Sequence, residues 1–285
     1  TVGDEAGTAI TTGDYNTAIG YAAGTAITTG INNTFVGGLS GDAITVGGNN
    51  TAVGEEALST DTQGSKSTAI GGNALANQNF TSATDALNTA VGFDAGVALT
   101  TATDDTIVGA LAGDAITTGS GITAVGKSAG TALTTGGDNT AIGKQALKTA
   151  TTGTANTAVG KDALEATTTA SNNTAVGAGA LTINTTGTTN TAVGAYALDA
   201  NTTANENTAV GYASLGANTT GAKNTAVGRT AMETNTTGAS NTAVGSDALT
   251  ANTEGSSNTA FGQEAAKAIT TGGENVAIGH GALDG

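Results

Sequence analysis

Residues 173–189 read NTAVGAGALTINTTGTT, and this unit recurs every 17 residues through the chain. Numbered from its Asn, the unit has Thr at position 2, Ala at position 3, Val or Ile at position 4 and Gly at position 5. The pair formed by positions 4 and 5 occurs 17 times, from Val2-Gly3 to Ile278-Gly279. Its spacing is broken once, by four extra residues within about 77–85. We therefore interpret residues 1–285 as a single repeat domain.

The length of the unit selects the fold class. Helical repeats need roughly 33 to 47 residues, and Thr, Gly and Asn are poor helix formers. Seventeen residues fit one solenoid coil with two short strands and two turns. Thr-Ala-Val suits a strand, the Gly closes it where a side chain would clash or a positive φ is needed, and Thr-Thr-Gly suits the second turn. The sequence predicts an all-β, parallel β-solenoid, or β-roll, of about 17 coils.

Two positions of the unit exchange their side chains in a coordinated way. Where position 9 is Gly, position 12 is a large apolar residue, as in Gly113 with Ile116. Where position 9 is Leu, position 12 is commonly Asn, as in Leu181 with Asn184. One large side chain is thus supplied per coil, so we expect positions 9 and 12 to fill the same interior slot.

The same pattern predicts a core and a contact surface. We expect the apolar residue at position 4 to point inward together with the large residue at position 9 or 12. A coil this thin gains stability by burying one more face, and the Ala stripe at position 3 is the candidate for contact between chains. The predicted core comprises Val159, Val176, Val193, Val210, Leu164, Leu181, Leu198, Ile10, Ile27 and Ile116, and the predicted interface comprises Ala175, Ala192 and Ala209.

Composition and charge exclude several classes of protein. With 45 Gly, 3% aromatic residues and neither Trp nor Pro, the chain has few large side chains for a thick core. A net charge of −15 opposes nucleic-acid binding. The absence of Cys excludes disulfides, and no apolar run is long enough for membrane insertion. Both ends are ordinary repeats without polar caps, so we expect the domain to be uncapped and continued at both ends by more chain or another subunit.

No motif indicates catalysis, a cofactor or a metal. His280 is the only histidine, and we expect it on the surface. The acidic pairs Asp104-Asp105 and Glu55-Glu56 lack a calcium-repeat pattern, so we expect solvated charges. The Asn at position 1 is expected to stack as an amide ladder. Six aromatic residues fall outside the predicted core and either contact sugars from the surface or cover loops: Tyr15, Tyr21, Tyr196, Tyr212, Phe80 and Phe93.

The run NTAVGxxALxxNTTG resembles the repeats of bacteriophage tail-fibre proteins that often carry a self-cleaving chaperone domain. It is also similar to the heads of trimeric autotransporter adhesins, whose shorter repeats contain an Asn-Ser-x-Ala-Ile-Gly type of motif. The resemblance covers the whole chain and implies a trimer of parallel left-handed β-rolls that presents a host-recognition surface. The adhesin-head period is shorter, and these residues show neither a chaperone domain nor a coiled-coil stalk.

These observations favour a structural or adhesive fibre segment rather than an enzyme. The expected location is extracellular or on a virion, and the expected partners are copies of the chain, in a trimer or end to end, and a host glycan or protein. An extracellular filament subunit that polymerises end to end is the alternative. A third hypothesis is ice binding by the Thr ladders at position 2 and at positions 13 and 14.

Overall fold

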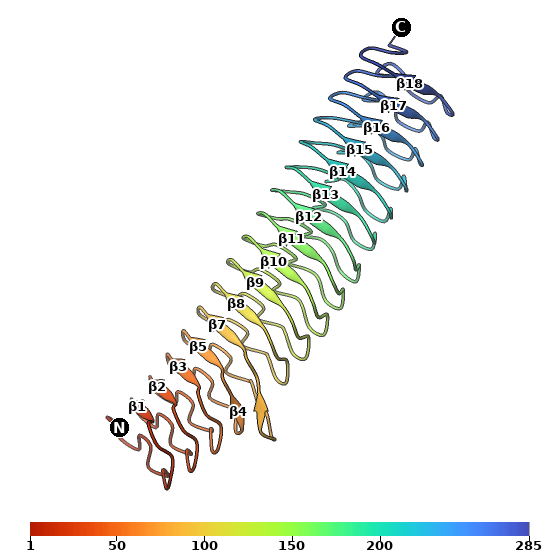
Figure 1. Ribbon diagram of the computed structural model, residues 1–285. Coiled ribbons are helices and arrows are strands. Elements are labelled where there is room, and N and C mark those ends of the chain that lie inside the picture. The colour runs from red at the N-terminus through yellow and green to blue at the C-terminus, as the bar shows by residue number, and fades with distance from the viewer. Residues whose placement is uncertain (285) are drawn as a thin grey trace. The chain divides into compact units, whose positions relative to one another are not determined.

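The computed structural model describes residues 1–284, and its regular structure is entirely β. The protein is a parallel β-solenoid in which each 17-residue unit forms one coil, as the sequence predicts. Figure 1 shows each coil as one short strand followed by a longer return segment. The chain divides into two compact units, Thr1–Ala141 and Ile142–Gly285.

In the first unit, the strands of successive coils pair in parallel. Each strand residue pairs with its counterpart in the next coil, as Thr17 does with Thr34, and across the four extra residues Thr68 pairs with Thr89. Two coils carry an additional pair, β4 (Gly64–Ser65) with β6 (Thr84–Asp85). The other strands are β1 (Thr17–Ile19), β2 (Thr34–Val36), β3 (Thr51–Val53), β5 (Thr68–Ile70), β7 (Thr89–Val91), β8 (Thr106–Val108) and β9 (Thr123–Val125).

The second unit repeats this arrangement without interruption. Residues one period apart are paired throughout, as Ala175 is with Ala192. Strand β10 (Thr140–Ile142) spans the boundary between the two units. The remaining strands are β11 (Thr157–Val159), β12 (Thr174–Val176), β13 (Thr191–Val193), β14 (Thr208–Val210), β15 (Thr225–Val227), β16 (Thr242–Val244), β17 (Thr259–Phe261) and β18 (Val276–Ile278).

A regular coil contains one strand, so the expectation of two strands per coil is wrong. Positions 6–11 form consecutive turns because positions 7 and 9 both adopt positive φ, 57° at Tyr196 and 52° at Leu198. Left-handed residues at alternate positions prevent an extended backbone. The coils are nevertheless hydrogen-bonded there, since the amide of Leu181 donates to the carbonyl of Ala197 over 3.0 Å.

The glycine at position 5 is required by both geometry and space. Gly211 has φ of +137°, and a Cβ atom on it would stand 2.4 Å from the carbonyl oxygen of Gly228 in the next coil. A side chain would therefore collide with backbone that cannot move without breaking the stack. This confirms the interpretation of the apolar-Gly pair as the close of a strand.

The exchange between positions 9 and 12 is a packing relationship inside the coil. Leu181 and Ile116 are both fully buried. In the Gly coils, the position-12 side chain reaches the space beside position 9, since the Cδ1 atom of Leu133 lies 3.0 Å from where a Cβ on Gly130 would stand. The predicted interior slot is confirmed. Of the other predicted core residues at these positions, Leu164, Leu198 and Ile27 are fully buried, and Ile10 is partly buried.

The orientation predicted for the strand is wrong, because positions 3 and 4 have exchanged roles. Position 3 points inward, so the predicted interface is core: Ala175, Ala192 and Ala209 have no exposed surface. Position 4 points outward, so the predicted core residues at that position lie on the surface: Val176, Val193 and Val210 are each 37% exposed, and Val159 is partly exposed.

The narrow interior explains this orientation. Across the coil, a Cβ on Gly130 at position 9 would lie 3.7 Å from the Cβ of Ala124 at position 3. The return segment is thus so close to the strand that a methyl group fills the gap. Apart from Thr1 in the first coil, residues larger than Ala occur at position 3 only as Phe35 and Ile107, and both extend into space left by Gly at position 9.

The four extra residues are held by a buried polar network. The Asp61 carboxylate accepts from the amides of Gly64 and Phe80 at 2.9 and 3.0 Å and from Nε2 of Gln78 at 2.6 Å. Gln78 in turn accepts from Nδ2 of Asn88 at 2.9 Å. Phe80 is buried here, so this aromatic residue covers the widened loop.

Candidate interaction surface

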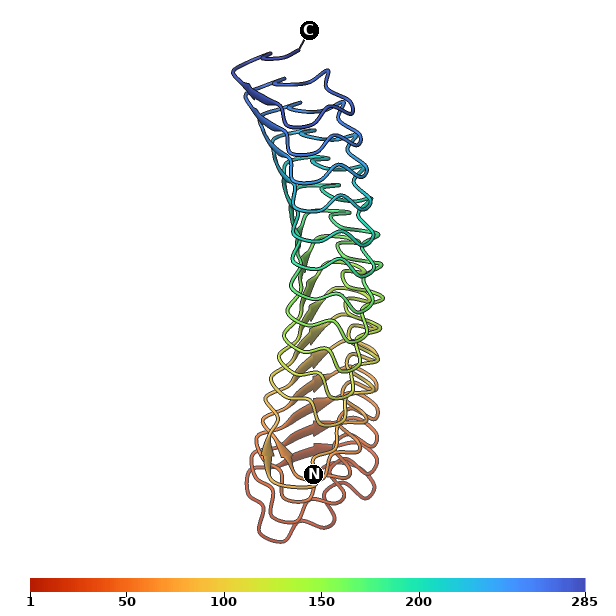
Figure 2. The same ribbon diagram turned by 90° about the vertical axis from the view of Figure 1, so that its right-hand side faces the viewer.

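The outward face of the strands is the most regular surface of the protein. In each three-residue strand, position 2 and position 4 point away from the core while position 3 points into it. The strand arrows of each unit follow one another along a single side of the coils (Figure 2). Every position-2 residue is Thr except Val276, and every position-4 residue is Val, Ile or Phe261. We call this surface the sheet face.

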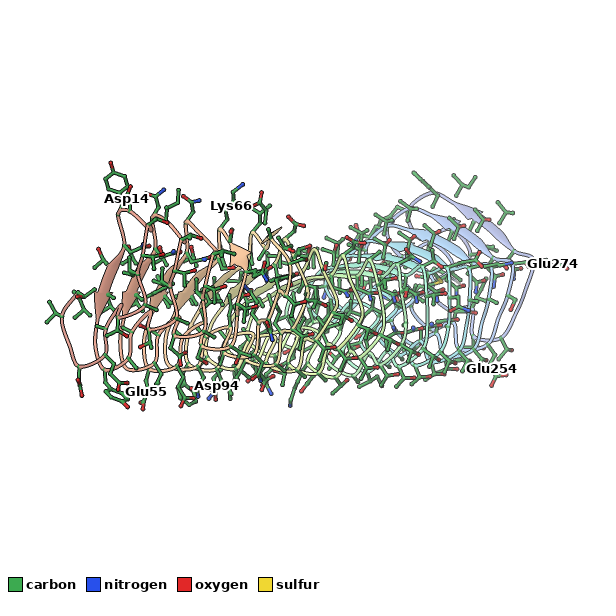
Figure 3. All side chains as sticks on the ribbon, turned by 90° about the horizontal axis from the view of Figure 1, so that it is seen from below. Asp14, Glu55, Lys66, Asp94, Glu254 and Glu274 are labelled. Carbon is green, nitrogen blue, oxygen red and sulfur yellow. The ribbon has the colours of Figure 1, made fainter. Side chains whose placement is uncertain are left out.

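No charged residue occurs at position 2 or 4 in any coil. The charges lie mostly at the turns that flank the sheet face. In the first unit, Asp14 and Lys66 lie along one edge of the coils, and Glu55 and Asp94 lie along the other (Figure 3). A strip with a Thr row and an apolar row is therefore bordered by two polar edges. An uncharged, aliphatic strip of this regularity is typical of a surface that associates with another surface.

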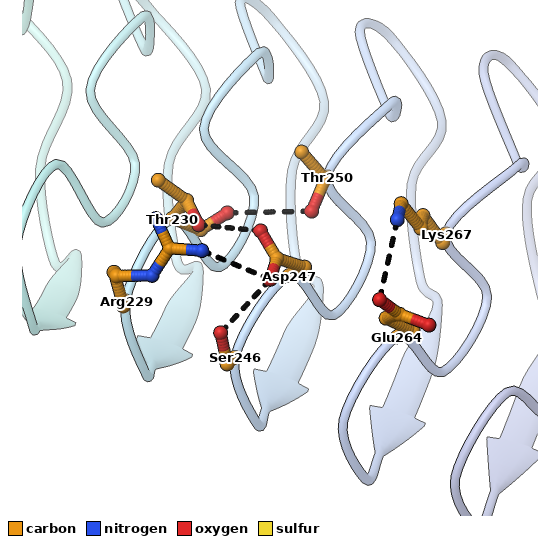
Figure 4. A network of polar contacts seen from close by, with 7 residues as sticks. All are labelled: Arg229, Thr230, Ser246, Asp247, Thr250, Glu264 and Lys267. Carbon is orange, nitrogen blue, oxygen red and sulfur yellow. Dashed lines mark hydrogen bonds and ion pairs between the residues drawn. The ribbon is translucent and has the colours of Figure 1, made fainter.

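One polar edge in the second unit is ordered by contacts between coils. The Asp247 carboxylate accepts from Oγ1 of Thr230 at 2.7 Å, from Oγ of Ser246 at 2.9 Å and from the Arg229 guanidinium at 3.4 Å (Figure 4). The hydrogen bond from Thr230 is the main reason that the pKa of Asp247 is lowered, with smaller contributions from Ser246 and Arg229. This edge keeps its charges paired and hydrated, which opposes association through it.

The Asn residues at position 1 form the expected ladder, and its contacts are structural. Oδ1 of Asn173 accepts from the backbone amide of Asn190 at 3.0 Å, and Nδ2 of Asn190 donates to the carbonyl of Ala204 at 2.8 Å. Each side chain thus joins two coils and ties the strand entry to position 15. Because these amides are buried and fully used, they cannot serve to read a ligand.

A second Asn ladder at position 12 was not recognised from the sequence. Nδ2 of Asn201 donates to Oδ1 of Asn184 at 2.8 Å and Nδ2 of Asn218 to Oδ1 of Asn201 at 3.1 Å. The ladder ends at Asn252, whose Oδ1 is buried without a hydrogen-bond partner, because the next coil has Ile269 at this position. The run of Asn at one repeat position was the available signal.

The Thr rows differ in what their hydroxyl groups do. At position 13 the hydroxyl is used within the stack, as Oγ1 of Thr202 donates to the carbonyl of Thr219 at 3.2 Å. At position 14 the side chain is exposed, as at Thr203. At position 2 it lies on the sheet face and is partly exposed, as at Thr191. Positions 2 and 14 are therefore the Thr rows that solvent reaches.

The remaining sequence-based candidates separate into surface and core. His280 and the pair Glu55-Glu56 are exposed. The expectation of solvated charge is wrong for Asp105, which is 1% exposed and takes the place of Asn in the position-1 ladder. Burial raises the pKa of this carboxyl to about 7, with a further contribution from Asp104 and an opposing hydrogen bond from the Ile122 amide. In residues 1–284, no group of three or more His, Cys, Asp or Glu side chains is placed to hold a metal ion.

The sequence matches no protein-family model, and no curated protein matches it significantly. In the part of the chain that the structure describes, no helix has the length and apolar character needed to cross a membrane.

Proposed function

We propose that this chain is a structural or adhesive fibre segment that associates with copies of itself through the sheet face. The observation that supports the proposal most directly is the unbroken apolar row at position 4, which is uncharged and partly exposed in coil after coil. The trimer implied by the resemblance to tail fibres and adhesin heads is the arrangement we favour. Such a segment acts outside the cell or on a virion.

The geometry of the sheet face suits self-association. Val176, Val193 and Val210 stand in register on adjacent strands, about 4.8 Å apart. Identical copies present identical row spacings, so within each compact unit the rows of one copy match those of another coil by coil. Burying an aliphatic side chain contributes about 1.5–3 kcal/mol relative to full exposure. Even a third of that value, summed over the coils of a unit, stabilises an assembly substantially.

The test is the mass of the intact protein by light scattering, with Val193→Arg as the interface variant. We expect a trimer for the wild type, and for the variant a shift toward monomer, because an unpaired charge would be buried in each contact. Thr203→Arg is the matched control, since Thr203 is an exposed position-14 residue that lies outside the strands of the sheet face. A monomer mass for the wild type at micromolar concentration would contradict the proposal.

Ice binding is a second candidate because the sheet face alternates an outward Thr with an outward aliphatic residue. Thr191 and Val193 are two residues apart on the same strand, and the pattern repeats in each neighbouring strand. A regular array of hydroxyl and methyl groups can order water. Inhibition of ice recrystallisation by the wild type, and its loss in Thr191→Lys, would support this function. A wild type without such inhibition that forms trimers would exclude it.

A further inference from the structure

A groove in the second unit interrupts the regular surface. It has a volume of about 540 Å³ and lies on the return segments of neighbouring coils, with none of its lining residues at position 2 or 4. The sheet face is therefore left free, and the groove stays open when that face is covered. Its lining includes Tyr196, Tyr212, Asp199, Gly216, Glu233 and Thr234.

The groove exists because one side chain is absent. Position 10 carries a side chain in every coil except that of Gly216, which has none. Asp199 and Glu233 occupy position 10 in the coils before and after it, so they flank the gap at a separation of two coils. Oδ1 of Asp199 lies 3.4 Å from the point where a Cβ on Gly216 would stand, so the carboxylate leans into the gap.

Two aromatic rings stand at one side of this gap. Tyr196 and Tyr212 come from adjacent coils, and their ring centroids are 6.1 Å apart with an interplanar angle of 87°. The ring of Tyr196 packs over Gly179, with its Cδ1 atom 3.0 Å from where a Cβ on that glycine would stand. Both residues remain about half exposed. An edge-to-face pair fixed by packing gives a preformed apolar surface beside the carboxylates.

The charges of the groove restrict its ligand. None of the residues that line it is Lys or Arg. The neighbouring cations have acidic partners of their own, since Lys161 pairs with Asp162 at 2.9 Å and Arg229 with Asp247 at 3.4 Å. Phosphates and acidic sugars are therefore disfavoured. The pKa of Asp199 is raised by burial, so its carboxyl gains from a ligand that donates hydrogen bonds without bringing negative charge.

We infer that this groove binds a neutral saccharide, with a pyranose ring against Tyr196 and Tyr212 and hydroxyl groups that donate to Asp199 and Glu233. The inference rests on the adhesive function proposed above and names the class of ligand. Pyranose rings have an apolar face that packs on aromatic rings and hydroxyls that pair with carboxylates. Two coils span roughly 10 Å, a length that suits a short oligosaccharide lying along the open groove rather than a small cation in a closed cage.

Calorimetric titration with cellotriose, maltotriose, mannotriose and triacetylchitotriose tests the inference on the intact wild-type protein. We expect at least one of these neutral trisaccharides to bind with a millimolar or tighter Kd. Gly216→Thr should weaken that binding at least tenfold by filling the gap. The substitution suits the fold because Thr occupies position 10 at Thr182 and Thr250. Asp199→Asn should weaken binding as well, with the groove shape unchanged.

Tyr21→Ala is the matched control for Tyr212→Ala, because both tyrosines are exposed at position 6 and Tyr21 does not line the groove. We expect the first variant to bind as the wild type does and the second to lose binding. If none of the four trisaccharides binds at a ligand concentration of about 10 mM, so that every Kd is weaker than the millimolar range, the inference is overturned. Equal binding by Gly216→Thr, or binding of tetramethylammonium in place of the saccharides, would overturn it as well.

Light scattering on the same samples separates this result from the proposed assembly. Gly216→Thr should keep the wild-type mass, because Gly216 does not lie on the sheet face. A monomeric protein that binds a trisaccharide would contradict the assembly and leave the groove assignment standing. A trimer that binds none of them would do the reverse.

Discussion

The Cδ1 atom of Ile116 lies 2.5 Å from the point where a Cβ atom on Gly113 would stand. Ile116 therefore occupies, from position 12, the space that Leu fills from position 9 in other coils. The two positions share one volume, and a coil holds one large side chain between them. This relationship makes the stability of a double variant predictable from the sequence of a neighbouring coil.

Gly130→Leu alone should destabilise the protein by about 1–3 kcal/mol through overpacking, and Leu133→Ala alone by about 2–5 kcal/mol through a cavity. This coil suits the test because its position 3 is Ala124, whereas Ile107 takes up part of the space beside Gly113. The double variant should recover most of this loss, because Leu147 with Ala150 is the same pair in a natural coil and both are fully buried. Urea unfolding of the four proteins gives the coupling energy. If the double variant loses the sum of the two single-variant losses in unfolding free energy, the two positions do not share one volume.

Removal of one Asn from the position-1 ladder should be costly. Asn207→Ala leaves the amide of Asn224 and the carbonyl of Gly221 without their partners at 2.9 Å. Each buried unpaired group costs about 1–3 kcal/mol, so the expected loss in the free energy of unfolding is about 2 kcal/mol or more. Asn205→Ala, at an exposed Asn of the same compact unit, is the control and should lose much less free energy of unfolding.

The position-5 glycine should tolerate no side chain. Gly211→Ala combines a φ of +137° with a Cβ placed 2.4 Å from the Gly228 carbonyl oxygen. We expect a loss of about 3 kcal/mol or more in thermal or urea unfolding. Gly38→Ala is the comparison, because a Cβ there meets nothing within 4 Å. Comparable losses for the two variants would show that the contact between coils is not the cause.

Asp105 should make stability depend on pH. Its folded pKa is about 7, above the usual value of 3.8, because it is buried with Oδ2 unpaired. The folded state therefore holds a proton that the unfolded state has lost between these pH values, and stability should fall as pH rises from about 4 to about 7. The full difference is roughly 4 kcal/mol.

Asp105→Asn should remove most of that fall and raise the melting temperature at pH 8, because a neutral amide restores the residue used in most other coils. A smaller fall should remain, since burial also raises the pKa values of Asp42, Asp114 and Asp199. Asp104→Asn, at the exposed neighbour, is the control. It should leave most of the pH dependence in place, since Asp104 contributes less to the raised pKa than burial does. A wild type whose melting temperature is constant between pH 4 and 8 would contradict the assignment.

Residue spacing alone predicts the solenoid, its 17-residue coil, the glycine at position 5 and the slot shared by positions 9 and 12. These features follow from spacing, because a parallel stack places residues one period apart beside each other and makes their identities repeat. The Asn ladder was predictable for the same reason. The strand was also found, since a β-compatible tripeptide before an obligatory glycine has few alternatives.

The side of the strand that faces inward becomes clear only in the folded coil. Alternation in a strand leaves two orientations, and the larger residue, as at Val193, was assigned to the core on hydrophobicity alone. The return segment is so close that Ala192 fills the interior and Val193 must lie outside. Phe35 and Ile107, each next to coils with Gly at position 9, were the sequence signal of an inward position 3.

The groove at Gly216 likewise depends on tertiary structure. Tyr196 and Tyr212 are 16 residues apart in sequence, one less than the period, so they occupy different repeat positions and the spacing gives no sign of a pair. The rings meet because positions 7 and 6 of adjacent coils lie side by side on the same turn, at 6.1 Å. Periodicity in the sequence predicts the features that every coil shares. A site made of residues that depart from the repeat can be recognised only once the positions of those coils in space are known.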